Sequence, residues 1–387
     1  MGEHRTGELN ESKVIKGRGA TTSPKPRFLK TATVPFDDGW SSHDLLNTEF
    51  SERALRTKLF PDKTRSLITT NQSPDVPFDQ SINPYKGCEH GCVYCFARPT
   101  HAFLDLSPGL DFETKIFYKT NPVERLREKL DNPRYACEPI AMGTNTDPYQ
   151  PAEKELRVTR QILETLLEYR HPVSIVTKGV LILRDIDILQ ELAQQELVSV
   201  AVSITTLHNE LKTKLEPRTA SPKARLRIVR AMAESGIPVG VMVAPIIPML
   251  NDHELEKIVE ESANEGAGFA GYIMIRLPLE VRPLFEDWLE EHYPLKAERI
   301  MNRIRDLHIG REYSAQFGER MRGTGMYADL MQKRFALALA NCGLPSHSSE
   351  SSSGEQKRRL FANTQGSGDL RIDLFRRGNE LSLLFDD

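Results

Sequence analysis

A short stretch near residue 90, KGCEHGCVYCFAR, places three cysteines at positions 88, 92 and 95. The whole chain has five cysteines, so this stretch is the one place where they cluster. Disulfide frameworks pair cysteines in small secreted domains, which this pattern does not suggest. It indicates a metal site. A closed zinc site needs four ligands, so three cysteines predict a zinc site completed by His90 or His101, or an iron–sulfur cluster with an open position. Thiols without metal are the remaining alternative.

The composition, 39% hydrophobic and 27% charged over 387 residues, is typical of a globular protein with room for one barrel-type domain or two smaller ones. A net charge of −3 provides no overall attraction to nucleic acid. The sequence has no apolar run of about 18 residues, and its beginning, MGEHRTGELNESK, lacks the apolar stretch of a secretory signal. We therefore expect no membrane association and a cytoplasmic location, where cysteines stay reduced.

Between residues 81 and 308, short β-branched apolar runs alternate with segments of helical periodicity. Such runs indicate parallel strands covered by helices. We predict an α/β fold, a partial (β/α)6 TIM-type barrel with an N-terminal extension and C-terminal helices plus a tail; a doubly wound sheet is the alternative. The predicted strands are 81–85, 139–143, 173–177, 198–204, 239–244 and 271–275, and the predicted helices are 121–130, 153–169, 182–195, 221–235, 252–265 and 283–307.

The predicted organisation has five parts. A surplus of Lys and Arg among Gly, Ser, Thr and Pro in the first 35 residues predicts a flexible basic arm, either solvated or in contact with nucleic acid. The stretch SHSSESSSGEQKRR after Pro345 is typical of a linker. The parts are the arm (1–35), an N-terminal extension (36–80), the core (81–308), a C-terminal helical extension (309–344) and a linker with a tail (345–387).

The cysteine loop follows the first predicted strand, so we expect it at the carboxyl ends of the strands, where parallel α/β folds bind ligands. Three thiolates can hold three irons of a 4Fe–4S cluster and leave the fourth iron open. A C-x3-C-x2-C loop in this place, with an aromatic residue, Tyr94, before its last cysteine, resembles the radical S-adenosylmethionine (SAM) superfamily over roughly residues 80–308.

That resemblance implies two cofactors, a 4Fe–4S cluster on Cys88, Cys92 and Cys95 and SAM on the open iron. Reductive cleavage of SAM would give a 5′-deoxyadenosyl radical that abstracts hydrogen from a substrate. It also implies an electron donor such as a flavodoxin or a ferredoxin. The alternative is a non-catalytic iron–sulfur or zinc regulatory protein that binds a partner.

Polar side chains follow the second predicted strand, in MGTNTDPYQPAE. In the superfamily this position contacts the amino group of SAM, often through Gly-Gly-Glu, whereas here Thr144, Asn145 and Asp147 stand near it. Asn145 and Asp147 can accept hydrogen bonds from an ammonium group. The structural alternative is an Asx turn that ends the strand before Pro148.

The later strand ends offer further candidates. Lys178 in IVTKG suits a carboxylate or a ribose oxygen, and Ser203 in SITT suits a ribose. Arg218 in LEPRTASP could bind the SAM carboxylate through its guanidinium fork. The prolines of VAPIIPMLND could flank the adenine, and Arg276 in IRLP could reach the substrate side. For each, an ordinary solvated or turn residue is the alternative.

The combination of GTNTDPYQPAE, VTKG, SITT and LEPRTASP resembles the branch of spore photoproduct lyase, a DNA-repair enzyme, and its uncharacterised bacterial relatives. This implies that Tyr94, Lys178 and Ser203 contact SAM. The residues by which the lyase transfers hydrogen have no counterpart at the matching positions of this sequence. Cys137 precedes the second strand, about 20 Å from the strand ends at about 3.3 Å per residue, and Phe96 stands where the lyase has a tyrosine. The substrate is therefore open, with a nucleic acid as one candidate.

The tail contains two similar segments, IDLF at 372–375 and ELSLLF at 380–385. They resemble the short peptides by which bacterial repair and replication proteins bind the sliding clamp. The alternative is local, because LRIDLF-RRGN-ELSLLF is also the pattern of a β-hairpin.

Overall fold

A seven-stranded sheet forms the centre of the molecule in the computed structural model, which describes residues 14–29, 56–76, 78–308, 310, 313, 315–345 and 370–378. Six of its strands are parallel, and β2 pairs antiparallel with β3 at one edge. The strand order is β10-β9-β8-β7-β6-β3-β2. The strands are β2 (Ile68–Thr70), β3 (Gln80–Ile82), β6 (Ile140–Met142), β7 (Val173–Thr177), β8 (Val198–Ser203), β9 (Val239–Ile246) and β10 (Phe269–Met274).

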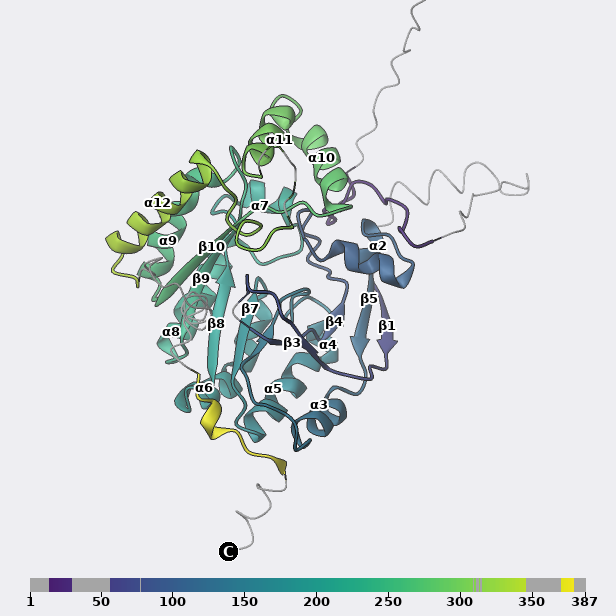
Figure 1. The fold of residues 1–387 in the computed structure, drawn as a ribbon, viewed down its shortest axis with the longest axis vertical. Helices are drawn as coiled ribbons and strands as arrows, with labels where there is room; N and C mark the ends of the chain where they lie inside the picture. The colour runs from purple at the N-terminus through teal and green to yellow at the C-terminus, as the bar shows by residue number, and fades with distance from the viewer. Residues whose placement is uncertain are drawn as a thin grey trace, which may run out of the picture.

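Helices cover the outer face of this sheet (Figure 1). Each buries one apolar stripe; in α5, for example, Ile162, Leu163 and Leu166 are fully buried. The prediction of a partial (β/α)6 barrel is confirmed. The covering helices are α3 (Pro122–Leu130), α5 (Val158–Glu168), α6 (Ile186–Gln194), α8 (Pro222–Glu234) and α9 (Leu255–Asn264).

Shorter elements and the C-terminal helices complete the described parts of the chain. No helix in these parts is both long and apolar enough to cross a membrane. The short helices are η1 (Arg98–Leu104), α2 (Leu110–Thr114), α4 (Glu153–Leu156), η2 (Val180–Asp185), α7 (Asn209–Leu215) and η3 (Asp252–Glu254), and the C-terminal ones are α10 (Val281–His292), α11 (Ala297–Asp306) and α12 (Met326–Asn341).

Three predicted helices differ from the observed ones. The helix predicted over 153–169 is two helices, α4 and α5, because Arg157 between them has a left-handed backbone with φ 50°. The helix predicted over 283–307 is α10 and α11, separated near Pro294, which cannot donate a helical hydrogen bond. Among the described residues of the helical extension predicted at 309–344, α12 is the one helix; Gly323 and Gly325 before it have positive φ.

A second, three-stranded sheet was not predicted from the sequence. Its order is β1 (Lys58–Asp62), β5 (Lys115–Lys119) and β4 (Tyr85–Lys86). The strand predicted over 81–85 is divided between the two sheets, with Pro84 at the break. Because β4 ends at Lys86, the cysteine loop begins where the two sheets meet.

The prediction of a flexible basic arm is wrong for residues 14–29. Arg18, Gly19 and Ala20 are buried. The carboxylate of Glu113 accepts hydrogen bonds from the backbone N–H groups of Gly19 and Ala20 at 3.0 and 2.9 Å, and Arg18 Nη1 donates to the Glu113 carbonyl at 2.8 Å. A buried carboxylate thus holds this segment. The rest of the predicted arm lies outside the described residues.

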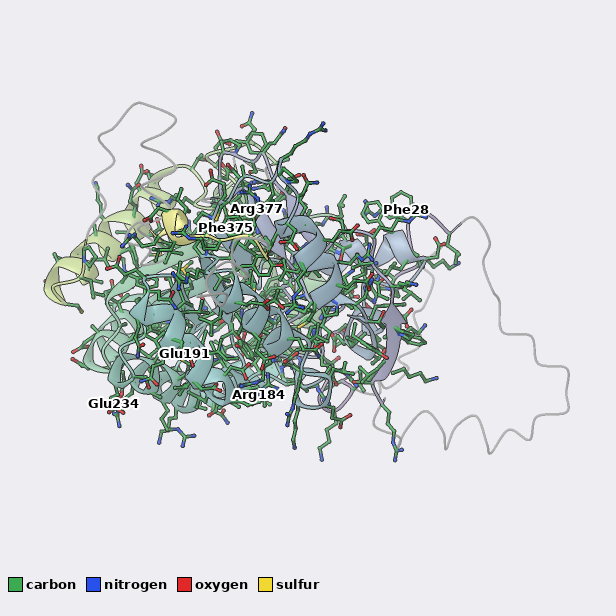
Figure 2. All side chains as sticks on the ribbon, turned by 90° about the horizontal axis from the view of Figure 1, so that it is seen from below. Phe28, Arg184, Glu191, Glu234, Phe375 and Arg377 are labelled. Atoms are coloured by element: carbon green, nitrogen blue, oxygen red, sulfur yellow. The ribbon has the colours of Figure 1, made fainter. Side chains whose placement is uncertain are left out.

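The described part of the tail, residues 370–378, lies against the barrel end formed by the carboxyl ends of α3, α5 and α6 (Figures 1 and 2). It contains η4 (Ile372–Leu374), a 3-10 helix, so the β-hairpin prediction is wrong for this part. The ring of Phe375 packs edge-on against Tyr135 and His171, with centroids 5.8 and 5.5 Å apart. The segment 380–385 lies outside the described residues.

Candidate active site at the cysteine loop

A cavity of about 730 Å³ opens at the carboxyl ends of the parallel strands. All three clustered cysteines line it, together with residues that follow β6, β7, β8 and β10. Its size is in the range of small-molecule and cofactor sites. Segments from outside the barrel, 69–76 and 320–322, also contribute to the wall. The fold therefore brings the cysteine loop and the predicted strand-end residues to one place.

The three thiols of the loop are free and line the same cavity. Cys88 and Cys92 are buried and Cys95 is half-buried. Burial, then the charges of Asp147, Cys92 and Cys95, raises the pKa of the Cys88 thiol, and burial and Glu216 raise the pKa of Cys92 to about 12. A cation bound to the sulfurs would remove this penalty. Three sulfur donors on one cavity wall fit an iron–sulfur cluster with an open position.

Arg98, the last residue of the sequence stretch that carries the cysteines, holds the loop together. Its buried guanidinium donates to the carbonyls of Gly91 and Cys92 at 3.2 and 2.9 Å, and to the carbonyls of residues 108 and 109, each at 3.0 Å. It also forms an ion pair with Glu113, fully buried on both sides. Glu113 in turn binds the N-terminal segment, so one ion pair connects the arm to the cysteine loop.

A second buried ion pair, Arg225 with Glu216, lies beneath Cys92 and Tyr94. Glu216 accepts hydrogen bonds from the Tyr94 hydroxyl and from Arg225, and its Oε2 lies 3.9 Å from Cys92 Sγ. Arg225 also donates to the Ser203 carbonyl at 2.9 Å. Burial, then the neighbouring Cys92 and Glu216 charges, raises the pKa of Tyr94 well above its usual value. The pair therefore fixes Tyr94, whose side chain lines the cavity.

Asp147 lines the cavity but is occupied by protein donors. Its carboxylate accepts from Thr177 Oγ1 and the Lys178 N–H, each at 2.7 Å, and lies 3.3 Å from His90 Nδ1. Burial acts to raise the pKa of Asp147, but His90 and these donors outweigh it and lower the pKa to about 2. Asp147 also accepts from the Tyr149 N–H at 2.9 Å, as in the predicted Asx turn. Its evident task is to fix the Lys178 loop.

Thr144 and Asn145 also line the cavity, and Asn83 positions them both. Asn83 Nδ2 donates to Thr144 Oγ1 at 3.2 Å, and Asn83 Oδ1 accepts from the Asn145 N–H at 3.0 Å. These contacts leave the Asn145 side-chain amide unused by any described residue. Asn83 was not recognised in the sequence.

Lys178 and Ser203 line the cavity, as predicted for strand-end residues, whereas Arg218 does not. The Lys178 ammonium has no ion-pair or hydrogen-bond partner among the described residues, and Ser203 Oγ donates to the Ala244 carbonyl at 3.2 Å. Arg218 instead pairs with Glu89 at 3.0 Å. The predicted role of Arg218 at the SAM carboxylate is therefore not favoured by this geometry.

The spacing of the sulfurs does not support the zinc alternative. Zn–S bonds of about 2.3 Å place the sulfurs of one zinc site within about 4.6 Å of one another, whereas Cys88, Cys92 and Cys95 are not among the described groups whose ligand atoms all lie within 4.8 Å of one another. His90 pairs with Asp147 through Nδ1. His101 Nε2 hydrogen-bonds to the Lys115 carbonyl at 3.1 Å, and His101 does not line the cavity. Cys137 packs half-buried against the main core and does not line the cavity, which agrees with its predicted distance from the strand ends.

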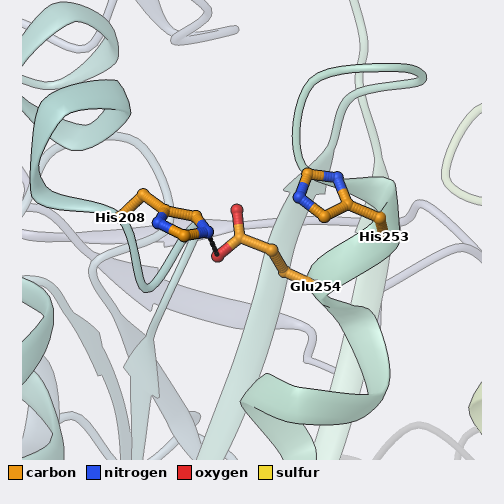
Figure 3. Close-up of side chains that lie close together, drawn as sticks. All are labelled: His208, His253 and Glu254. Carbon is orange, nitrogen blue, oxygen red and sulfur yellow. Dashed lines mark ion pairs between the residues drawn. The ribbon is translucent and has the colours of Figure 1, made fainter.

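A second group of potential metal ligands lies outside the cavity (Figure 3). His208, His253 and Glu254 have ligand atoms within 4.8 Å of one another. The Glu254 carboxylate, however, already accepts from Thr206 Oγ1 at 2.6 Å and from the Leu207 N–H at 2.7 Å. These bonds explain its burial, and we read the group as a support for the loop after β8.

A partial (β/α)6 barrel with three cysteines on the cavity wall at its strand ends defines a radical SAM protein. Residues 82–261 match the radical SAM superfamily, and the chain belongs to it. An uncharacterized protein of Mycobacterium tuberculosis is 40% identical over 235 residues, which are 60% of this chain and 68% of that protein. An uncharacterized protein of Methanocaldococcus jannaschii is 29% identical over 242 residues, 62% of this chain and 86% of the other.

Solved structures agree on the fold. Spore photoproduct lyase complexed with dinucleoside spore photoproduct superposes with a TM-score of 0.52 over 73% of this chain and 79% of the lyase, at 15% identity. At this identity the likeness shows the fold alone. The resemblance found in the sequence is confirmed at the level of the superfamily and the fold.

Besides Asn83, four charged supporting residues were not predicted from the sequence: Arg98, Glu113, Glu216 and Arg225. Two of them lie within the motifs that predict the site, Arg98 in KGCEHGCVYCFAR and Glu216 in LEPRTASP. Charged residues in otherwise apolar or tight loops beside metal ligands are a usable signal, because a buried charge needs a partner.

Proposed function

We propose that Cys88, Cys92 and Cys95 hold a 4Fe–4S cluster and that the neighbouring strand ends hold SAM. The observation that carries the proposal is that three free thiols line one cavity with the polar strand-end residues. The chemistry that these cofactors supply when bound is one-electron cleavage of SAM, which provides a radical for hydrogen abstraction from a substrate. The reductant is expected to be a flavodoxin or a ferredoxin.

Each strand-end residue is proposed to bind a different part of SAM. Lys178, a cation without a described partner, is placed to bind the carboxylate of the methionine part. The Asn145 amide and the Thr144 hydroxyl are placed to accept from its amino group. Ser203 uses its proton on Ala244 and keeps acceptor capacity for a ribose hydroxyl. Arg218 is left out of this set because Glu89 holds it outside the cavity.

The two buried ion pairs keep Tyr94 and the cysteine loop in position. Arg225 and Glu216 fix Tyr94 and support Cys92, while Arg98 and Glu113 fix the backbone of the loop. Preorganised ligands reduce the reorganisation that cofactor binding would otherwise need. A nucleic-acid substrate, either DNA or RNA, is part of the proposal and is supported by arginine and aromatic side chains on the cavity wall, among them Arg276, Tyr272 and Phe96.

The test is anaerobic reconstitution with iron and sulfide, followed by reduction with dithionite in the presence of SAM. We expect about four irons per chain and release of 5′-deoxyadenosine. Cys92→Ala should lose both, because two thiolates cannot hold the cluster, whereas Cys342→Ala, which changes a cysteine outside the cavity, should keep both. An intact cluster without SAM cleavage would favour the non-catalytic regulator instead.

A further inference from the structure

The cavity wall has more basic side chains than carboxylates among its described residues. Among the described lining residues there are two carboxylates, Asp75 and Asp147, and each already has a hydrogen-bonding or ion-pair partner on the wall. Asp147 pairs with His90, and Asp75 pairs with Arg320 at 2.5 Å. Neither carboxylate forms an ion pair with Lys178 or Arg276, two further cations on the wall.

Arg276, which follows β10, is a cation without such a partner. It makes no hydrogen bond or ion pair with any described residue, and its guanidinium lies over the Phe96 ring, 4.2 Å from the centroid. Burial lowers the pKa of Arg276 from its usual value. Stacking on a ring leaves the in-plane N–H groups of a guanidinium free, and these match an oxyanion bidentately.

Tyr272 is a second, independent sign of a missing ligand on the β10 wall of the same cavity. It lies on β10, four residues before Arg276, and is 7% exposed. Its hydroxyl is buried without a hydrogen-bond partner among the described residues, although it lines the cavity. A buried hydroxyl left unpaired costs free energy, so a group that accepts its proton would be favoured there.

The position of Arg276 separates it from the proposed SAM contacts. Lys178 and Ser203 follow β7 and β8, whereas Tyr272 and Arg276 belong to the β10 end of the barrel. Phe96, the ring beneath Arg276, directly follows Cys95. The guanidinium is thus next to the cysteine loop, on the side of the cavity away from β7, where a substrate would approach the reacting centre.

We propose that Arg276 and Tyr272 form a binding subsite for an oxyanion of the substrate, a phosphate or a carboxylate. The inference rests on the proposed function, since it names the substrate class for that same cavity. Arg276 binds the anion through its in-plane N–H groups, and the Tyr272 hydroxyl donates to it. Apolar lining residues, including Phe78, Leu279 and Met321, would contact the uncharged remainder.

The experiment measures binding to the reconstituted protein by calorimetry under anaerobic conditions. The charged probes are inorganic phosphate, acetate and thymidylyl-thymidine, which has one phosphodiester; thymidine is the uncharged probe. A charge-assisted bidentate contact predicts a loss of affinity of about 10-fold to 100-fold for the preferred charged probe in Arg276→Gln. Arg276→Lys should keep part of the affinity, and the exposed Arg230→Gln should behave as wild type.

Tyr272→Phe distinguishes a ligand contact from a structural role. Because the hydroxyl has no described partner, its removal should leave the melting temperature unchanged or raise it. The affinity for the charged probe should fall several-fold. The affinity for SAM should stay within about two-fold in every variant.

Three results would overturn the inference. The first is charged-probe binding that is equal in wild type and Arg276→Gln, or absent from wild type up to about 10 mM. The second is a loss of SAM affinity in Arg276→Gln as large as that for the probe. The third is a shifted cluster reduction potential without any change in probe binding. Failure of wild type to cleave SAM would instead count against the proposed function.

Discussion

Arg98 connects the cysteine loop to the segment before α2: its guanidinium donates to two carbonyls of the loop, to the carbonyls of residues 108 and 109, and to the Glu113 carboxylate. Lysine keeps the charge but cannot form the same fork. We expect Arg98→Lys to lose about 1–3 kcal/mol of unfolding free energy, because buried carbonyls are left without a donor, and to retain less iron. Urea unfolding and iron analysis would measure both.

The control for this change is Arg230→Lys, because Arg230 is exposed and pairs with Glu265 at the surface. Its cost should stay below about 1 kcal/mol. An Arg98→Lys protein with wild-type stability and a full cluster would contradict the role assigned to Arg98.

His101 gives the folded protein a defined sensitivity to acid. Its Nε2 bonds to the Lys115 carbonyl, and its buried Nδ1 has no described partner. Burial therefore lowers the pKa of His101 to about 4. As the pH falls from about 6.5 toward 4, the His101 imidazole binds a proton in the unfolded chain but stays neutral in the folded chain. The free energy of unfolding therefore decreases by on the order of 3 kcal/mol.

His101→Gln should reduce that loss, since its amide can still donate to Lys115 but does not titrate. The measurement is urea unfolding of the metal-free, reduced protein at pH 7 and pH 4.5 for both chains. Other titrating groups, such as His171, whose pKa burial also lowers to about 4, contribute equally to the two proteins. An equal loss of stability in both would show that His101 does not titrate as inferred.

Which strand-end residues face the cavity could be predicted only where the backbone is regular. Lys178 and Ser203 end or follow strands whose direction is set by the sheet, and both line the cavity. Glu216 and Arg218 lie in LEPRTASP just after α7, where the backbone at Glu216 has φ −149° and ψ 66°. In such a loop no periodicity relates the position of a residue to the direction of its side chain. The sequence therefore predicts Arg218 as the site residue, although Glu216 is the one that is buried beside Cys92.

Among the elements, the N-terminal segment has the closest fit to the cysteine loop. A Cβ added at Gly19 would lie 1.8 Å from the Gly91 carbonyl oxygen, so only glycine permits this approach. We expect Gly19→Ala to detach the segment and to cost about 1–3 kcal/mol, the usual range for overpacking. Trypsin should then cleave after Arg18, which is buried in the wild type.

Mass spectrometry of short digests would show this cleavage. Lys16→Ala, an exposed change in the same segment, should leave the bond after Arg18 protected. Equal protection in Gly19→Ala and wild type would mean that the segment is not held by this contact.

Strand prediction succeeded where one apolar run had clear limits. The predicted strand 173–177 is β7 residue for residue, because VSIVT lies between Pro172 and the Lys178-Gly179 turn. The second sheet was missed because its pairs are remote in sequence: Lys58 in β1 aligns with Lys115 in β5. A two-residue strand such as β4 has no periodicity to detect.

At the scale of the whole molecule, the proposed chemistry and the tail lie at opposite ends of the barrel (Figure 1). The tail bonds to groups at the carboxyl ends of the helices: Arg371 N–H to the Glu196 carbonyl at 3.1 Å, and Arg376 N–H to the Tyr169 carbonyl at 3.0 Å. The cysteines are at the carboxyl ends of the strands. Sliding-clamp binding through 372–375 remains a prediction, and it would require Phe375 to leave its site on the barrel.

Phe375 therefore offers a test of whether the two ends act separately. Its ring is partly buried against Tyr135 and His171, so we expect Phe375→Ala to cost about 1–3 kcal/mol, less than a fully buried phenylalanine. Ile372→Ala, at a side chain 45% exposed in the same segment, should cost less. Because no contact of the tail reaches the cavity within the described residues, both variants should release 5′-deoxyadenosine at the wild-type rate below their melting temperatures. A slower release by Phe375→Ala at full iron content would instead mean that tail docking controls the site at the other end of the barrel.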